Sequence, residues 1–200
     1  MRKVLAFYSP YPGAGKSTAA RIAQNIWHNA LPVSSHRMGA TATHSFAEPL
    51  HYFATHLMWR VGAANDKNGG IYAIHADEHK PLPELGGASY RDLLIAFGQA
   101  GRAVYPAIWA EVMRQWLKQY KHCDFAIDDL RFPNEYKMLR EEGARIVRIT
   151  NPDREIVATE TEALLEGCRF DAELVNPKQD VETYAKQIGT LLKDLYGGDA

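Results

Sequence analysis

Hydrophobic positions follow two alternating spacings along the chain. Short apolar segments at residues 4–8, 125–127, 145–150 and 172–175 predict strands of a buried parallel sheet. Between them, apolar residues recur every three or four positions, which is typical of amphipathic helices. Helices are predicted from Lys16 to Ala30, over 50–61, after Ser89, from Pro106 to Tyr120, from Pro133 onward and over 181–195. The alternation predicts a mainly parallel sheet with helices on both faces.

Two further segments lie between these predicted elements. Residues 62–88 have no apolar period and contain a polar glycine-containing stretch at 65–70 and two prolines at 81–83, which predicts a long loop or a mobile arm. Residues 155–166, between the predicted strands at 145–150 and 172–175, are predicted to form a short helix. We expect one domain, residues 1–200, in which 62–88 is an elaboration.

A glycine-rich turn, Pro12-Gly13-Ala14-Gly15-Lys16-Ser17-Thr18, lies between the first predicted strand and the first predicted helix. In such a turn, glycines let backbone N–H groups approach phosphate oxygens, with the N-terminus of a helix behind the anion. Lys16 is suited to the β and γ phosphates and the Ser17 hydroxyl to Mg²⁺. Pro10 stands where the full pattern has a further glycine. The alternative is a glycine-rich turn with a surface lysine.

Two acids, Asp128 and Asp129, directly follow the apolar segment at 125–127. An aspartate in this place holds Mg²⁺ in many phosphate-loop proteins, and the sequence leaves open which of the two faces the metal. The alternative is that either acid caps the turn into the helix at Pro133. Arg131 lies just beyond these acids. Two roles are open for its guanidinium: binding a phosphate, or a salt bridge to Asp128, Asp129 or Glu135.

Composition and charge narrow the function classes. The chain has 23 Lys and Arg against 24 Asp and Glu, a net charge of −1, which argues against a protein that grips long nucleic acid. A small phosphorylated ligand needs only a few placed cations. Two cysteines do not form a disulfide framework and favour a reducing compartment. No apolar run reaches the length of a membrane span, so we expect a soluble cytoplasmic protein.

The ordered set of motifs resembles the phage-type deoxynucleoside monophosphate kinases, phosphate-loop (P-loop) enzymes related to adenylate and thymidylate kinases. The resemblance spans most of the chain. It is carried by the glycine-rich turn, Phe46-Ala47-Glu48-Pro49-Leu50, Tyr90-Arg91-Asp92-Leu93-Leu94 with Gly98, Arg102 and Trp109, Asp128-Asp129-Leu130-Arg131-Phe132-Pro133-Asn134-Glu135, and Thr161-Glu162-Ala163-Leu164 with Asp171 and Asn176. Two departures are Pro10 and His51, because the family usually has lysine at the latter position.

The resemblance implies a three-layer P-loop fold with a mainly parallel five-strand sheet. It also implies Mg²⁺-assisted transfer of the γ-phosphoryl group of ATP to a deoxynucleoside 5′-monophosphate, yielding the diphosphate. By resemblance, Lys16, Asp128 and Arg131 are catalytic, and Ser17 and Asp128 hold the metal. ATP is bound by Gly13, Ala14, Gly15, Lys16, Ser17 and Thr18, and the acceptor by Phe46, Glu48, Arg91, Arg102, Asp129 and Arg131.

Several alternatives stay open at this stage. In one alternative, the acceptor is a different small molecule, such as dephospho-coenzyme A or a sugar acid. In another, the chain is a regulatory module that binds or hydrolyses ATP. Residues 150–170 are a candidate lid in which Arg154 or Arg169 closes on ATP, against a surface turn with solvated arginines. Small nucleotides are the expected partners, with no long nucleic acid and no membrane, and a homodimer is left open.

Overall fold

The computed structural model describes residues 2–30, 41–64, 74–75, 77–153, 164–177 and 180–197. They divide into two compact units. Unit 1 comprises Met1–Phe46 and Ala110–Ala200, and unit 2 comprises Ala47–Trp109. That the two units form one domain stays a prediction. Within the ranges given, no helix combines the length and the apolar character needed to cross a bilayer.

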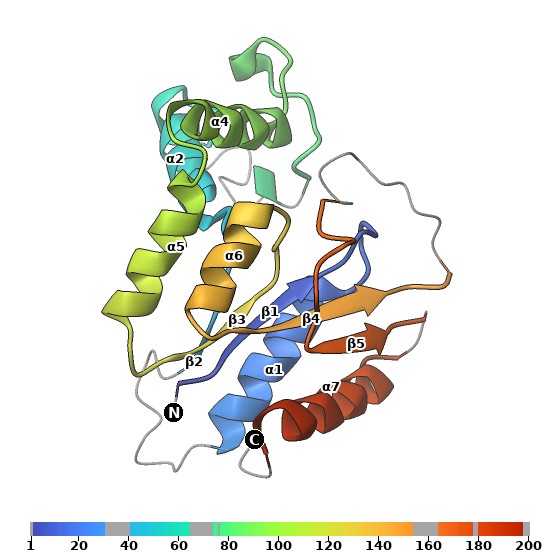
Figure 1. Cartoon of the computed structure of the whole chain (residues 1–200). Helices are drawn as coiled ribbons and strands as arrows, with labels where there is room; N and C mark the ends of the chain where they lie inside the picture. Colours follow the sequence, from blue (N-terminus) through green and yellow to red (C-terminus); the bar gives the residue numbers. More distant parts are fainter. Residues whose placement is uncertain are drawn as a thin grey trace. The chain divides into compact units, whose positions relative to one another are not determined.

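Unit 1 is built on a five-strand parallel sheet with the order β2-β3-β1-β4-β5 (Figure 1). The strands are β1 (Val4–Tyr8), β2 (Thr41–His44), β3 (Asp124–Ile127), β4 (Arg145–Thr150) and β5 (Ala172–Val175). The predicted α/β fold with a parallel five-strand sheet flanked by helices is therefore confirmed.

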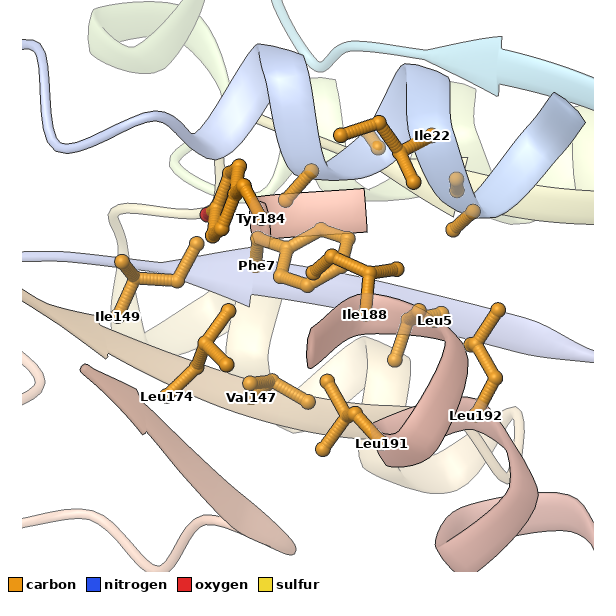
Figure 2. Packing of buried hydrophobic residues seen from close by; sticks show 14 of the residues in the cluster. Leu5, Phe7, Ile22, Val147, Ile149, Leu174, Tyr184, Ile188, Leu191 and Leu192 are labelled. Carbon is orange, nitrogen blue, oxygen red and sulfur yellow. The ribbon is translucent and has the colours of Figure 1, made fainter. Parts of the chain in front are cut away.

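Helices cover both faces of this sheet. Helices α1 (Lys16–Ala30) and α7 (Val181–Tyr196) pack on one face, against Leu5, Phe7 and Val147 (Figure 2). Helices α5 (Ile108–Gln119), from Ala110 onward, and α6 (Pro133–Glu141) pack on the other face, against the alternate residues of β1. Because successive side chains of a strand point to opposite faces, a strand covered on both sides must be apolar throughout. This explains the unbroken apolar run of β1.

One strand has no counterpart in the four apolar segments of the sequence. Strand β2 has the sequence Thr-Ala-Thr-His and lies at the edge of the sheet, where β3 is its one partner among the described strands and it is partly exposed. An edge strand needs fewer apolar residues than a central one because one side and part of a face meet water. Strand β2 forms because it pairs with the backbone of β3, and this pairing depends on the tertiary structure and not on the local sequence.

Local helix signals are confirmed with one shift of boundary. The Ser89 hydroxyl and the Asp92 carboxylate form the reciprocal capping box that begins α4 (Tyr90–Val104). Gly143, after α6, has a φ of +76°, as expected at a helix C-terminus. Helix α5 begins at Ile108, and not at Pro106, which lies in the preceding turn. The helix predicted over 155–166 falls mostly outside the described residues, and 164–167 form a turn.

Unit 2 has its own small core between α2 (Glu48–Arg60) and α4, and it also holds the 3-10 turn η3 (Pro83–Leu85). Trp109 packs into this core, and its indole N–H donates to the carbonyl of Gly98 over 3.1 Å. A Cβ at Gly101 would lie 2.4 Å from the Trp109 ring, so only glycine permits this approach. Tyr90 is also fully buried here, so both aromatic residues serve the core of unit 2.

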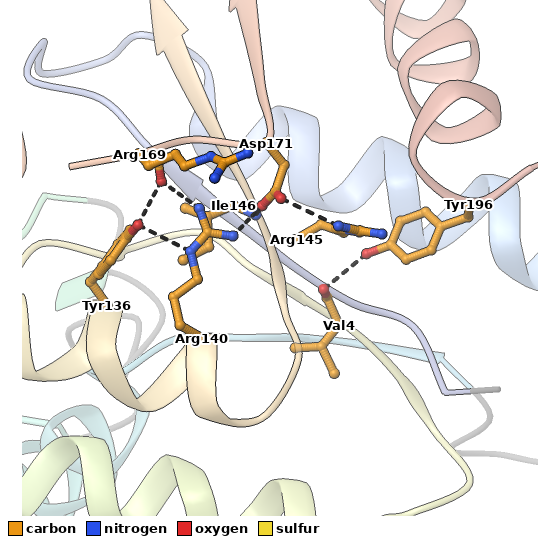
Figure 3. A network of polar contacts seen from close by, with 8 residues as sticks. All are labelled: Val4, Tyr136, Arg140, Arg145, Ile146, Arg169, Asp171 and Tyr196. Atoms are coloured by element: carbon orange, nitrogen blue, oxygen red, sulfur yellow. Dashed lines mark hydrogen bonds and ion pairs between the residues drawn. The ribbon is translucent and has the colours of Figure 1, made fainter.

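A polar network joins α6 to the chain entering β5 (Figure 3). The Asp171 carboxylate accepts the Ile146 N–H over 2.7 Å and pairs with Arg140 and, over 3.4 Å, with Arg145. Burial raises the pKa of Asp171, but the Ile146 N–H and the positive charge of Arg140 outweigh it, so its pKa lies below its ordinary value. The ionised carboxylate therefore stabilises the folded chain.

Asp171→Asn is expected to lower the free energy of unfolding at pH 7 by about 1.5–3 kcal/mol, because hydrogen bonds to a charged group are lost. A folded-state pKa below the unfolded value of about 3.9 gives a contribution that is complete above that value and is lost as the pH falls through the folded pKa. The gap between wild type and variant should thus narrow below about pH 4 in urea unfolding. A gap that is constant with pH would contradict this, and Asp194→Asn on the exposed side of α7 serves as control.

Candidate functional site

The glycine-rich loop connects the carboxyl end of β1 to the N-terminus of α1. Strand β1 lies between β3 and β4, so the chain passes to β2 and β3 on one side and to β4 and β5 on the other. In open parallel sheets, ligands bind at the carboxyl ends of the strands where the chain changes direction in this way. The loop lies at that position.

The loop backbone requires glycine at two positions. Gly13 has a φ of +66° and Gly15 a φ of +94°, both in the left-handed region that side chains disfavour. A Cβ on Gly15 would also lie 2.6 Å from the Nδ2 atom of Asn176. Glycine here therefore satisfies both a backbone conformation and a close approach from the end of β5.

The chain enters the loop differently from the full phosphate-loop pattern, because Pro10 stands where that pattern has a further glycine. Ser9 is buried, and its hydroxyl accepts the N–H of Tyr11 over 3.1 Å. This bond spans Pro10, whose ring holds φ and supplies no N–H. The bond and the proline together define a tight turn at this point of the chain.

Two side chains from other elements hold the carbonyl groups of the loop. The Asn176 side-chain amide, just after β5, donates to the Ala14 carbonyl over 2.8 Å. The Tyr184 hydroxyl of α7 donates to the Gly15 carbonyl over 3.4 Å. Burial raises the pKa of Tyr184, so the phenol keeps its proton at neutral pH and remains a donor. Neither residue has a role predicted from the sequence above, although an asparagine directly after the last strand is a signal for it.

The N-terminus of α1 carries positive character. Its first residues are Lys16, Ser17 and Thr18, and no acid lies in its first turn. The first N–H groups of a helix have no partner within the helix and together carry about half a positive charge, which attracts anions. Lys16 adds a full charge at the same end, and the exposed Ser17 adds a hydroxyl.

The two acids after β3 have different surroundings. Strand β3 is hydrogen-bonded to β1, with Ala6 opposite Ile127, so both acids lie at the sheet edge where the loop begins. Asp129 accepts the backbone N–H of Phe46 over 2.7 Å. The carboxylate of Asp128 makes no hydrogen bond or ion pair within the described ranges, and only its backbone N–H is engaged, by the His44 carbonyl. Asp128 is therefore the acid whose oxygens are available to a cation.

Arg131 has a guanidinium that forms no ion pair with any residue the structure describes, including the three acids considered above. Glu135 instead accepts the backbone N–H groups of Arg131 and Phe132, each over 3.0 Å, and so caps the start of α6. The salt-bridge alternative for Arg131 has no support in these contacts, and its positive charge is available to a ligand.

The candidate acceptor residues are divided between the two units. In unit 1, Phe46 is only 4% exposed and packs in the core, so its contact with an acceptor stays a prediction. In unit 2, Glu48 begins α2, and Arg91 and Arg102 lie in the first and last turns of α4. Arg91 pairs with Glu78 over 3.7 Å. The use of these three charged residues by an acceptor also stays a prediction.

His51 does not replace the lysine that the resemblance leads one to expect. Its Nδ1 atom lies 3.3 Å from the Tyr90 hydroxyl, which also contacts His75 Nε2 at 3.0 Å. Burial lowers the pKa of His51, so the ring is neutral at neutral pH and contributes no positive charge for a phosphate.

Of the lid predicted over 150–170, residues 154–163 lie outside the described ranges, Arg154 among them. Arg169 is described and exposed, and its carbonyl accepts the Tyr136 hydroxyl over 2.6 Å. Closure of either arginine on ATP stays a prediction.

A magnesium ion fits the donors at this edge of the sheet. Mg²⁺ prefers oxygen ligands and is commonly held by one or two protein oxygens together with phosphates and water. The Ser17 hydroxyl and the Asp128 carboxylate supply such oxygens. Among the residues with described positions, no group of three His, Cys, Asp or Glu side chains is placed to hold a metal by itself.

Comparisons with known proteins add little to this description. No protein family profile matches the chain, and no curated protein matches it in sequence. Among solved structures, the chain is similar to the unliganded crystal structure of a sugar kinase from Janibacter sp. HTCC2649, with a TM-score of 0.48 and 14% identity over 100% of this chain and 99% of that one. A similarity of this size carries no inference about substrate or reaction.

Proposed function

We propose that this protein is an ATP-dependent kinase that phosphorylates deoxynucleoside 5′-monophosphates to diphosphates. The observation that carries the kinase assignment is the loop of Gly13, Gly15 and Lys16 at the carboxyl end of the central strand, with Asp128 at the end of the adjacent strand. This arrangement joins an anion site to a cation site at one edge of the sheet, which is what a metal–triphosphate complex requires.

The chemistry needs charge compensation more than acid–base catalysis. A phosphate acceptor is already an anion at neutral pH, so it attacks without first losing a proton to a strong base. The barrier comes from repulsion between two polyanions and from charge on the transferring group, which positive side chains reduce. Two side chains of unit 1 are suited to this: Lys16 at the helix N-terminus, and Arg131, whose guanidinium forms no ion pair with a residue of described position.

Each residue of the loop edge then has a defined task. The N–H groups of the loop and Lys16 orient the β and γ phosphates, and Arg131 attracts the acceptor phosphate or the transferring group. Ser17 and Asp128 would hold Mg²⁺, which when bound neutralises phosphate charge. Asp129 holds the backbone at Phe46, where the chain passes toward unit 2.

The assignment of the acceptor class rests on the ordered motifs. The segments Phe46-Ala47-Glu48-Pro49-Leu50 and Arg131-Phe132-Pro133-Asn134-Glu135 support a deoxynucleotide over other phosphorylated acceptors. In the structure, the second segment forms the start of α6, where the Glu135 carboxylate accepts the backbone N–H of Arg131 over 3.0 Å. By the same resemblance, Arg91 and Arg102 of α4 are candidate acceptor residues, and their use by an acceptor is part of the proposal.

A coupled ADP-release assay tests this function. With ATP and Mg²⁺ present, ADP release is expected to rise by at least about tenfold when one or more of dAMP, dGMP, dCMP and dTMP is added, with a dNDP as the second product. Gluconate and dephospho-coenzyme A are the matched comparison acceptors. Release stimulated only by one of these would assign a different acceptor, and release independent of any acceptor would identify an ATPase.

A further inference from the structure

We propose that Asn176 is a positioning residue for the phosphate loop, holding the loop in the orientation that binds a triphosphate. The inference rests on the proposed function in that the loop is taken to bind ATP. It does not depend on which acceptor is used. Asn176 itself touches no phosphate in this proposal, because it acts through the peptide group between Ala14 and Gly15.

The contact of Asn176 is with the backbone of the loop and is short. Its side-chain N–H donates to the Ala14 carbonyl over 2.8 Å, and its own backbone N–H donates to the Thr150 carbonyl over 2.8 Å. The second bond continues the pairing of β5 with β4 by one residue. The amide is thus carried on the sheet itself, which gives it a rigid base from which to hold the loop.

The direction of the peptide group follows from its geometry. The described residues contain no cis peptide bond, and in a trans peptide the C=O and N–H groups point in opposite directions. Because the Ala14 carbonyl points toward Asn176, the N–H of Gly15 points away from β5. The Gly15 carbonyl accepts the Ala19 N–H over 2.8 Å and faces Tyr184, so the N–H of Lys16 also points away from α7.

The close fit of glycine against asparagine supports a specific contact. A Cβ on Gly15 would lie only 2.6 Å from the Asn176 amide nitrogen, so the absence of a side chain at Gly15 is what admits the amide. If the amide is removed, the Ala14 carbonyl loses its partner, and the peptide is free to rotate toward water. Rotation would turn the Gly15 N–H away from the phosphate and replace it by a carbonyl oxygen, which repels an anion.

The test measures binding of AMPPNP with Mg²⁺ by calorimetry to Asn176→Leu and Asn176→Ala. Leucine keeps the approximate shape of asparagine and removes the donor without adding charge. Both variants are expected to raise the Kd for the ATP analogue by about tenfold or more, the change that one lost oriented donor produces. Where a dNMP is accepted, the KM for ATP should rise while the KM for the dNMP stays within twofold.

Asp180→Ala is the control for local destabilisation. Asp180 caps α7, the helix that carries Tyr184, through the Thr183 N–H and hydroxyl, and it makes no hydrogen bond or ion pair with the loop within the described ranges. Its loss should lower the melting temperature, as cap removal does, and leave the Kd for the analogue within twofold. Tyr184→Phe removes the longer bond to Gly15 and should raise the Kd by less than Asn176→Leu.

The outcomes separate this inference from the proposed function. Unchanged affinity in both Asn176 variants, or an equal loss in Asp180→Ala, would overturn it. A wild-type protein that does not bind the analogue at all would overturn the inference together with the kinase assignment. If wild type binds the analogue, the Asn176 variants lose it and no dNMP is phosphorylated, the inference stands and the acceptor assignment fails.

Discussion

Lys16→Ala is expected to lower the rate of phosphoryl transfer by about 100- to 1,000-fold, the loss that follows removal of one oriented charge from a transition state. Lys16 is the first residue of α1, where its ammonium group adds to the positive end of the helix. No other residue in the first turn of α1 carries a positive charge that would take its place. The measurement is kcat in the coupled ADP-release assay with the best acceptor.

The fold should survive this substitution, because the Lys16 side chain is not part of the hydrophobic core of unit 1. Arg21→Ala, at an exposed position on the same helix, removes a positive charge without approaching the loop and is the matched control. Its kcat should stay within twofold of wild type, and the melting temperatures of both variants should stay close to that of wild type. Undiminished turnover in Lys16→Ala would remove this lysine from the mechanism.

Replacing the two adjacent acids by alanine should produce opposite phenotypes. Asp128→Ala is expected to lower kcat by about 100-fold or more and to raise the Mg²⁺ concentration needed for half-maximal activity, because it removes a metal ligand. Its stability should change by less than about 0.5 kcal/mol, since the carboxylate makes no hydrogen bond within the described residues. Asp129→Ala should destabilise the fold by about 1–3 kcal/mol, because the Phe46 N–H loses its charged acceptor.

Parallel measurements on the two variants decide between these roles. Urea unfolding gives the change in stability, and a magnesium titration of activity gives the change in metal requirement. Each variant serves as the control of the other, because the substitutions are identical in type and adjacent in sequence. A higher Mg²⁺ requirement in Asp129→Ala with none in Asp128→Ala would reverse the assignment of the metal ligand.

Much of the fold could be predicted from local patterns. The unbroken apolar run of β1 requires a strand buried on both faces, and the spacing of Ala19, Ile22 and Ala23 requires a helix that packs on one side. The capping box at Ser89 and the glycine at 143 are likewise local, since each involves bonds or dihedral angles within a few residues. Such signals can be read from sequence because the interacting groups are neighbours in the chain.

Only some features of the glycine-rich loop and the acids beside it could be predicted from neighbouring residues. The need for glycine at residues 13 and 15 and the position of Lys16 at the start of a helix follow from the local sequence, and the structure has them so. Which of Asp128 and Asp129 accepts a backbone hydrogen bond does not follow from the local sequence, because it depends on where the Phe46 N–H lies, 83 residues earlier in the chain.

Read alone, the sequence determined that this is an α/β chain with a parallel sheet, and that a glycine-rich turn ending in a lysine follows its first strand. Only the tertiary structure decided the strand order, the edge strand β2, the separation of unit 2, and the contact of Asn176 with a loop 162 residues away. The physical reason is that hydrogen bonding between strands and approach across a sheet edge depend on which segments the fold makes neighbours. Apolar periodicity specifies which face of an element is buried, and it carries no information about the partner.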